Sequence, residues 1–155
     1  AMIITLEQLK TLRACPEQRS LFESLFGKSV EITEALCLRH AQEFNWGWAA
    51  ETLLSPQAWE GYIVARTQAW EAFEANRGPA LKAREAVRVE AWERFKTARG
   101  NRNRVWKVWG AAQVEAWGAY DVALAPILKA YDVARAIAFA RAATKKALDR
   151  SLARR

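Results

Sequence analysis

The sequence predicts an all-α fold in which a small helical head precedes an antiparallel helical hairpin or bundle built from eight eleven-residue repeats. Two observations lead to this prediction. The first 55 residues contain closely spaced helix start and stop signals. From residue 58 onward, similar segments recur every eleven residues, with one longer interval. Eleven residues make three turns of a helix at about 3.67 residues per turn, so equivalent positions return to one face.

The head, residues 1–55, contains signals for short helices rather than strands. Thr5 and Gln8 have the spacing of a capping box, and the helix that they open is expected to end just before Pro16. Pro16 then suits the first position of a second helix, which Gly27 ends. The head therefore starts with two helices joined by a short turn.

Two further short helices are expected in the head. Residues 29–32 are expected to form an extended link, after which Thr33 caps a helix that runs to about Phe44. A fourth helix follows, and its tryptophans, Trp46 and Trp48, are expected to hold the head against the repeats. The expected buried side chains are Leu21, Phe22, Leu25 and Phe26 in the second helix and Ala35, Leu36, Leu38 and Ala41 in the third.

The repeats alternate small and aromatic residues along one helical stripe. Repeat positions 1, 5 and 8 form this stripe, and tryptophans at position 2 lie on its flank. Small residues let helices approach closely and aromatic rings fill the remaining space, so helix packing is the preferred interpretation and an aromatic binding platform the alternative. Position 9 often carries an arginine that can reach the ring at position 5: Arg66, Arg77, Arg88, Arg99 and Arg135. The copies begin at residues 58, 69, 80, 91, 105, 116, 127 and 138.

The longer interval divides the repeats into two equivalent arms. We expect a first arm over residues 56–101, a basic turn at 102–104 and a second arm with a basic tail over 105–155. Each arm has a proline at the same place, Pro79 and Pro126. If the prolines only kink the helices, the arms form a long hairpin; if the chain reverses there, four shorter helices form a bundle. We favour the bundle, because long arms would leave their aromatic rings poorly covered.

Positive charge is concentrated in the repeats. The formal charge of the chain is +7, and it divides into −2 for residues 1–57 and +9 for residues 58–155. A local excess of cations suits an anionic partner. The densest cluster surrounds the expected turn and supplies the candidate binding residues, which are Arg94, Lys96, Arg99, Arg102, Arg104 and Lys107.

The sequence contains no recognisable catalytic constellation or nucleotide-binding loop. The single histidine, His40, follows Cys37 by three residues, and with Cys15 these are three possible zinc ligands where a structural site usually needs four. Cys37 and His40 could also approach as a catalytic dyad, but no third group that would orient them can be named from the sequence. Structural roles are therefore expected for both residues. We therefore expect no enzyme activity, no cofactor and no metal.

The apolar runs are only a few residues long, whereas crossing a bilayer takes about 20. The first twelve residues lack the basic start and apolar block of a secretory signal. Because no secretory signal is recognised, the two cysteines are expected to remain reduced thiols, as in the cytosol. A cytoplasmic protein is expected, with no membrane association.

Five segments of the head carry a resemblance to a known family. They are ACPEQ at 14–18, LF at 21–22, FG at 26–27, SVEITE at 29–34 and FNWGWAA at 44–50. Together with the repeats rich in alanine, aromatic residues and arginine, this head resembles the leader of a family of uncharacterised phage and bacterial proteins. The resemblance implies a phage or prophage setting and brings no catalytic residues.

A non-enzymatic interaction protein that binds a protein partner is the leading functional hypothesis. In the implied phage setting, such a protein would inhibit a host defence system such as CRISPR or restriction. Direct nucleic-acid binding through the basic turn is one alternative, since tryptophans lie near the cations. Self-assembly is another, because a homodimer would cover the aromatic stripe.

Overall fold

The computed structural model describes residues 2–98 and 100–152 and confirms the mostly helical fold, a small head followed by two long helices packed as a hairpin. Arg99 and residues 153–155 of the expected basic tail lie outside the described residues. The elements in chain order are β1 (Ile3–Thr5), α1 (Leu6–Thr11), α2 (Pro16–Phe26), β2 (Ser29–Glu31), α3 (Glu34–Arg39), α4 (Trp46–Leu53), α5 (Pro56–Thr97) and α6 (Arg102–Leu152).

The helix boundaries of the head follow the predicted caps. The Thr5 hydroxyl accepts a hydrogen bond from the Gln8 amide, and the Gln8 side chain accepts one from the Thr5 amide, which completes the capping box of α1. Thr33 caps α3 in the same manner, through the Leu36 amide. Gly27 ends α2 at a φ of +69°, a conformation that favours glycine. Helices α1 and α3 are shorter than predicted, and turns occupy residues 12–13 and 40–43.

The prediction of helices without strands in the head was wrong. β1 and β2 pair antiparallel, with Ile4 opposite Val30, and the expected extended link at residues 29–32 is therefore mostly a strand. Three-residue strands are too short to show the alternation of apolar and polar residues by which a strand is recognised. The partner of each strand also lies far along the chain, so the pairing leaves no local signal.

The chain divides into two compact units. The head unit contains residues 1–69 and 131–155, that is, the head with the first part of α5 and the last part of α6. The tip unit contains residues 70–130, the remainder of both helices and the turn between them.

The core of the head unit contains side chains of α1 to α4 and of the adjoining parts of α5 and α6. Tyr62, Phe139 and Cys37 are its largest fully buried side chains. Alanines of α6 lie around Phe139 in this core, and their small side chains let α6 pack closely against the head. This agrees with the helix-packing interpretation of the repeat. The other buried or partly buried members include Trp46, Trp48, Ala50, Ala136, Ala140 and Ala143.

Some buried positions predicted in the head were wrong. Phe22 is buried, and Leu21, Phe26 and Leu36 are partly buried, but Leu25, Ala35 and Leu38 are exposed. Cys37 takes the central place in α3. The reason is that α3 has fewer than two turns, so only a narrow strip of its surface faces the core.

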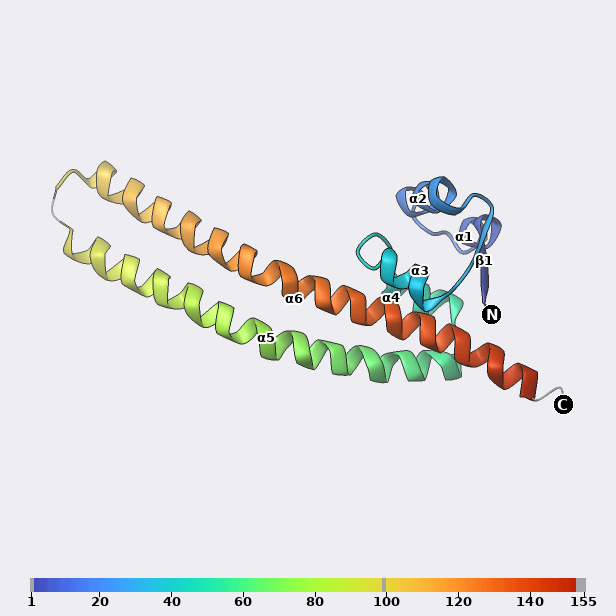
Figure 1. Ribbon diagram of the computed structural model, residues 1–155. Helices are drawn as coiled ribbons and strands as arrows, with labels where there is room; N and C mark the ends of the chain where they lie inside the picture. The colour runs from blue at the N-terminus through green and yellow to red at the C-terminus, as the bar shows by residue number, and fades with distance from the viewer. Residues whose placement is uncertain (1, 99, 153–155) are drawn as a thin grey trace. The chain divides into compact units, whose positions relative to one another are not determined.

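The preference for a four-helix bundle was also wrong. Figure 1 shows α5 and α6 as two continuous helices side by side, with Pro79 and Pro126 inside them. Both prolines are exposed, so their rings do not disturb the packing between the helices. Because proline has no backbone N–H, the carbonyl four residues earlier loses its hydrogen bond, and on the exposed side it can turn toward solvent. Between the two long helices, α5 ends at Thr97 and α6 begins at Arg102. Asn101 accepts a hydrogen bond from the Asn103 amide, so α6 begins at Arg102 and includes the predicted basic turn at 102–104.

Candidate interaction surface on the tip unit

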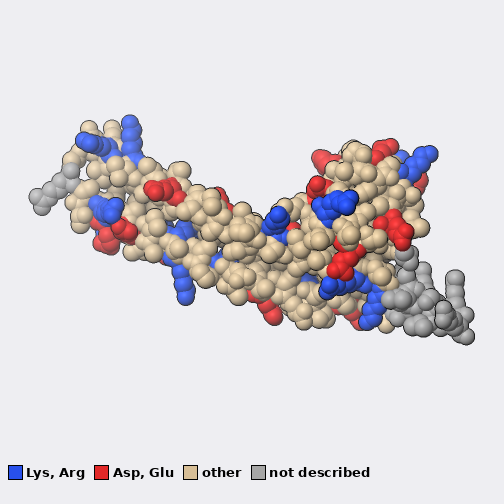
Figure 2. All heavy atoms as spheres, viewed as in Figure 1, with Lys and Arg blue, Asp and Glu red and all other residues tan. Residues whose placement is uncertain are grey.

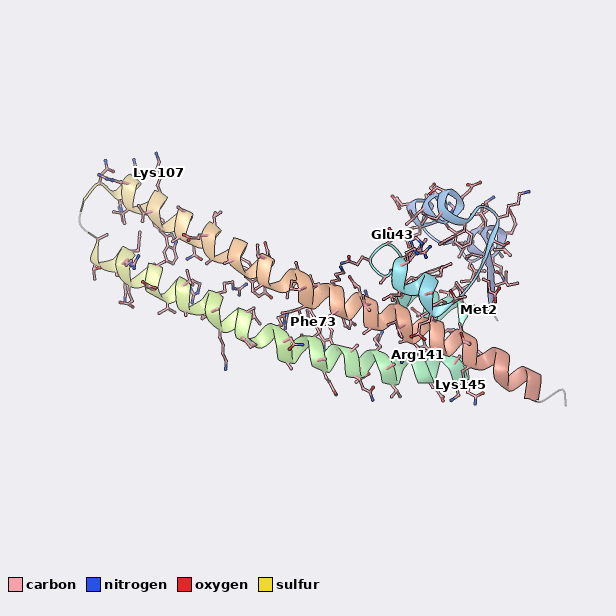
Figure 3. All side chains as sticks on the ribbon, viewed as in Figure 1. Met2, Glu43, Phe73, Lys107, Arg141 and Lys145 are labelled. Carbon is pink, nitrogen blue, oxygen red and sulfur yellow. The ribbon has the colours of Figure 1, made fainter. Side chains whose placement is uncertain are left out.

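The tip unit has very little buried core. In the described part of residues 70–130, the hydrophobic side chains that are buried are Phe73, Ala116 and Tyr120, and Figure 3 labels Phe73 between the two helices. Tyr120 and Phe73 occupy repeat position 5, and Ala116 position 1, as the stripe predicts. Two helices alone cannot enclose the remaining apolar side chains, which stay open to solvent.

Four aromatic rings pack together near the turn. The Phe95 ring lies 4.9 Å from Trp106 and 5.8 Å from Trp109, measured between ring centroids. Trp92 stacks on Phe95 at 5.4 Å and meets Trp109 edge-on at 5.5 Å. Such pairs are worth about 0.5–1.5 kcal/mol each beyond the area that they bury. The cluster therefore joins the end of α5 to the start of α6.

Two of the six candidate cations are neutralised on their own helix. Arg94 pairs with Glu90 at 2.5 Å, and Lys96 pairs with Glu93 at 2.8 Å. Glu90 and Glu93 lie four and three residues before their partners, on the same face of the helix, where the density of cations in the sequence gave no sign of the pairing. Arg94 and Lys96 are therefore poor anchors for an anionic ligand.

Three other candidate cations remain available. Arg102, Arg104 and Lys107 are exposed and, among the described residues, no carboxylate lies within ion-pair distance of them. Figure 3 places Lys107 on the side of α6 away from α5, and Figure 2 shows basic side chains at the tip of the hairpin. All three stand at the start of α6, where the helix dipole is also positive. Arg99, the remaining candidate, lies outside the described residues.

One face of the helix pair forms a groove of about 580 Å³ near the turn. Its apolar lining comes from both helices, and Val108 is 65% exposed there. Four charged side chains line it as well, namely Glu90, Arg94, Arg104 and Glu115. The principal apolar side chains are Val87, Ala91, Phe95, Val105, Val108 and Trp109.

A row of tryptophans flanks the helix pair outside that groove. Trp106 follows Val105, and one residue turns a helix by about 100°, which carries its ring past the groove. The row consists of the position-2 residues Trp70, Trp92, Trp106 and Trp117, which are 42–52% exposed. We call these four residues the tryptophan face. The sequence-based prediction named only cations as binding residues and gave an aromatic binding platform as the alternative to helix packing; the recurrence of tryptophan at position 2 was the signal for this face.

Cation–π contacts were predicted for the position-9 arginines, and the structure confirms two of them. Arg77 lies 5.5 Å from the Phe73 ring and Arg135 lies 4.7 Å from the Tyr131 ring. Arg88 instead pairs with Glu85 on the same helix.

An unpredicted contact joins the two helices across the tryptophan face. Arg84 of α5 stacks on Trp117 of α6 at 4.0 Å and lies 4.9 Å from the Tyr120 ring. Its guanidinium therefore covers part of one exposed tryptophan.

Cys37 is a buried free thiol, and His40 contacts a neighbouring carboxylate. Burial raises the pKa of the Cys37 thiol to about 12, so it remains protonated near neutral pH. His40 Nδ1 contacts Glu43 at 2.5 Å, and its ring packs on Phe26 and Phe44. Within residues 2–98 and 100–152, no group of three or more His, Cys, Asp or Glu side chains is placed to hold a metal ion.

Comparisons with known proteins identify no relative: no family model, curated protein or solved structure matches the chain. In the part of the chain that the structure describes, no helix has the length and apolar character to span a membrane.

Proposed function

We propose that this chain is a non-enzymatic interaction protein that binds a protein partner through the tryptophan face of its tip unit. The supporting observation is the row of four half-exposed tryptophans, all at position 2 of the eleven-residue repeat. Tryptophan supplies the largest apolar area of any side chain and is enriched among residues that dominate binding energies. Leaving four of them half-open to water is unfavourable for an isolated hairpin, and a partner surface would remove that cost.

The spacing of the row also suits a protein surface. Trp106 and Trp117 are three helical turns apart on α6, which separates them by about 16 Å. A partner helix or sheet can contact both at once, so their contributions would combine. The Arg84 guanidinium stacked on Trp117 adds a charged group at the edge of the same surface, where a carboxylate of the partner could meet it.

The phage or prophage setting that the resemblance implies supports a particular class of partner. We propose a host defence complex, such as a CRISPR or restriction enzyme, as the target that the chain inhibits. This assignment rests on the resemblance alone, whereas the tryptophan face stands on its own geometry.

Affinity capture with matched variants tests the proposal. The tagged chain is incubated with a bacterial host lysate, with and without nuclease, and bound proteins are identified by mass spectrometry. We expect a stoichiometric partner that survives nuclease and is lost with Trp106→Ala/Trp117→Ala. The control, Val114→Ala/Val122→Ala, changes two apolar residues of α6 that are even more exposed but lie outside the tryptophan face, and it should retain the partner. Equal capture by both variants would contradict the proposal.

Direct nucleic-acid binding is the second candidate, supported by the unpaired cations at the start of α6. Arg102 and Lys107 are exposed beside Trp106, whose open ring offers a stacking surface for a base. Cations without an acidic partner contact phosphates without first breaking an ion pair.

Fluorescence anisotropy with single-stranded and duplex oligonucleotides tests this second function. Arg102→Gln/Lys107→Gln should weaken binding and reduce the slope of log affinity against log salt by about 1 for each cation removed. Lys96→Gln, which removes a cation already paired with Glu93, is the control and should have a smaller effect. Binding no tighter than that of an equally basic helical protein at low salt would exclude this function.

A further inference from the structure

We propose that the groove of the tip unit is the contact surface of an antiparallel homodimer, in which the grooves of two copies face each other. The first argument is that apolar side chains of the groove stay open to solvent. Val87 is 42% and Val108 65% exposed, although both line the concave face of the helix pair. A second helix pair laid on this face would complete a four-helix core of the kind that the repeat pattern suggests.

The charges at the rim of the groove fit a second copy in one orientation. Arg104 and Glu115 both lie on α6, eleven residues apart and hence on the same side of the helix. Neither has an ion-pair partner among the described residues. A two-fold axis that crosses α6 midway between them, near Trp109, brings Arg104 of one copy opposite Glu115 of the partner subunit, and the reverse pair forms by symmetry.

The same axis also matches the charges on α5. Trp92 contacts Trp109 across the hairpin, so the axis meets α5 at the level of Trp92. Glu90 and Arg94 lie two residues to either side of that level, and both line the groove. Glu90 and Arg94 already pair with each other on α5, and the rotation sets this pair against its symmetry mate, so that each charge also faces an opposite charge of the partner subunit. Arg104 and Glu115 gain in this arrangement the ion-pair partners that they lack among the described residues of their own chain.

A parallel arrangement of the two copies would be unfavourable. It would bring the two basic tips together, each with Arg102, Arg104 and Lys107 unpaired, and like charges repel across an interface. The antiparallel arrangement instead sets the start of each α6 beside a less charged stretch of the partner subunit's α6. Between residues 108 and 128 of α6, the charged residues are Glu115 and Asp121.

The size of the groove face suits a dimer. Its lining on α6 extends from Arg104 to Ala119, which is about 23 Å of helix, and two adjacent helices are about 20 Å wide. The face thus has a projected area of about 460 Å², and side-chain relief raises the accessible area toward the roughly 800 Å² per partner of a stable complex.

Sedimentation of the full chain at several concentrations, with charge exchange, tests the dimer. The wild type should associate reversibly. Arg104→Glu and Glu115→Arg each place two like-charged pairs in the interface and should raise the dimer dissociation constant about tenfold or more. An equimolar mixture of these two variants should dimerise again, because every pair in the mixed dimer is then opposite in charge. Wild type that stays monomeric, or variants whose mixture associates no better than either alone, would overturn the proposal.

A second pair of variants guards against effects on folding. Val108→Glu places a carboxylate on the open floor of the groove and should abolish dimerisation, whereas Val114→Glu, at a residue 74% exposed and outside the groove, should leave it intact. Circular dichroism should show both folded. The proposed dimer and the proposed partner binding are tested independently. A monomeric chain that still captures its partner refutes the dimer alone. A dimeric chain that captures nothing refutes the proposed function alone.

Discussion

The indole ring of Trp46 lies 5.4 Å from the ring of Phe139, although 93 residues separate them in the sequence. The Trp46 indole N–H donates a hydrogen bond to the Ala41 carbonyl, which fixes the ring where α4 begins. Phe139 has no exposed surface and lies among alanines of α6. This pair therefore joins the head to the hairpin in the head unit.

Removing the Phe139 ring should unfold the head unit at much lower denaturant concentration. Phe139→Ala leaves a cavity among residues that cannot collapse into it, so we expect a loss of about 3–5 kcal/mol in the free energy of unfolding. Equilibrium denaturation followed by tryptophan fluorescence measures it. Val114→Ala, at an exposed site, is the control and should change stability by less than about 0.5 kcal/mol. A similar loss in both variants would show that Phe139 has no special role.

Replacing the helical prolines should stabilise the tip unit. Pro79 and Pro126 lie inside α5 and α6 and are exposed, so neither ring contributes packing that alanine would lose. Proline in a helix interior is unfavourable by about 3 kcal/mol relative to alanine, and we expect Pro79→Ala and Pro126→Ala each to recover part of that amount. Calorimetry should show a higher Tm. A lower Tm would mean that the bend at the proline is needed for the helices to pair.

The proline result also explains what the sequence could predict of the fold. The eleven-residue period and the caps at Thr5 and Thr33 are local signals, and they correctly predicted helices and most of their boundaries. Whether Pro79 breaks a helix depends on which side of the helix faces its neighbour, and that is a tertiary property. The pairing of β1 with β2 was missed for the same reason, because each strand is too short to be recognised without its partner.

The candidate surface was only partly predictable. Charge density selected Arg102, Arg104 and Lys107, which are exposed and unpaired, but it also selected Arg94 and Lys96, which acids of the preceding turn neutralise. The repeat showed that tryptophans recur at position 2. Their exposure depends on how few helices cover them, and that number follows from the hairpin rather than from the repeat.

The hydroxyl of Tyr62 should be dispensable for stability. Tyr62 is fully buried, its ring stacks on Trp59 at 5.6 Å, and its hydroxyl has no hydrogen-bond partner among the described residues. An unsatisfied buried polar group costs about 1–3 kcal/mol, so Tyr62→Phe should leave the free energy of unfolding unchanged or raise it within that range. Tyr62→Ala should lower it by several kcal/mol through the lost ring. Destabilisation by Tyr62→Phe would reveal a partner for the hydroxyl, such as an ordered water.

The two cysteines should differ sharply in reactivity. Cys15 is exposed, whereas Cys37 has no exposed surface. The thiolate is the reactive form, and burial, with a smaller contribution from the nearby Glu34 carboxylate, raises the pKa of Cys37 from 9.0 to about 12. An aromatic disulfide reagent should therefore titrate one thiol in the native protein and two in denaturant. Cys15→Ser should remove the fast reaction, and a persisting fast reaction would contradict the burial of Cys37.

The same pKa shift predicts how stability depends on pH. The folded state holds the Cys37 proton more tightly than the unfolded state, so its contribution is complete below pH 9 and is lost as the pH rises toward 12. Wild type should lose more free energy of unfolding across this alkaline interval than Cys37→Ala, when each is compared with its own value at pH 8. Denaturation curves at stepped pH measure the difference. Parallel curves for the two proteins would show that the thiol ionises as readily in the folded chain as in the unfolded one.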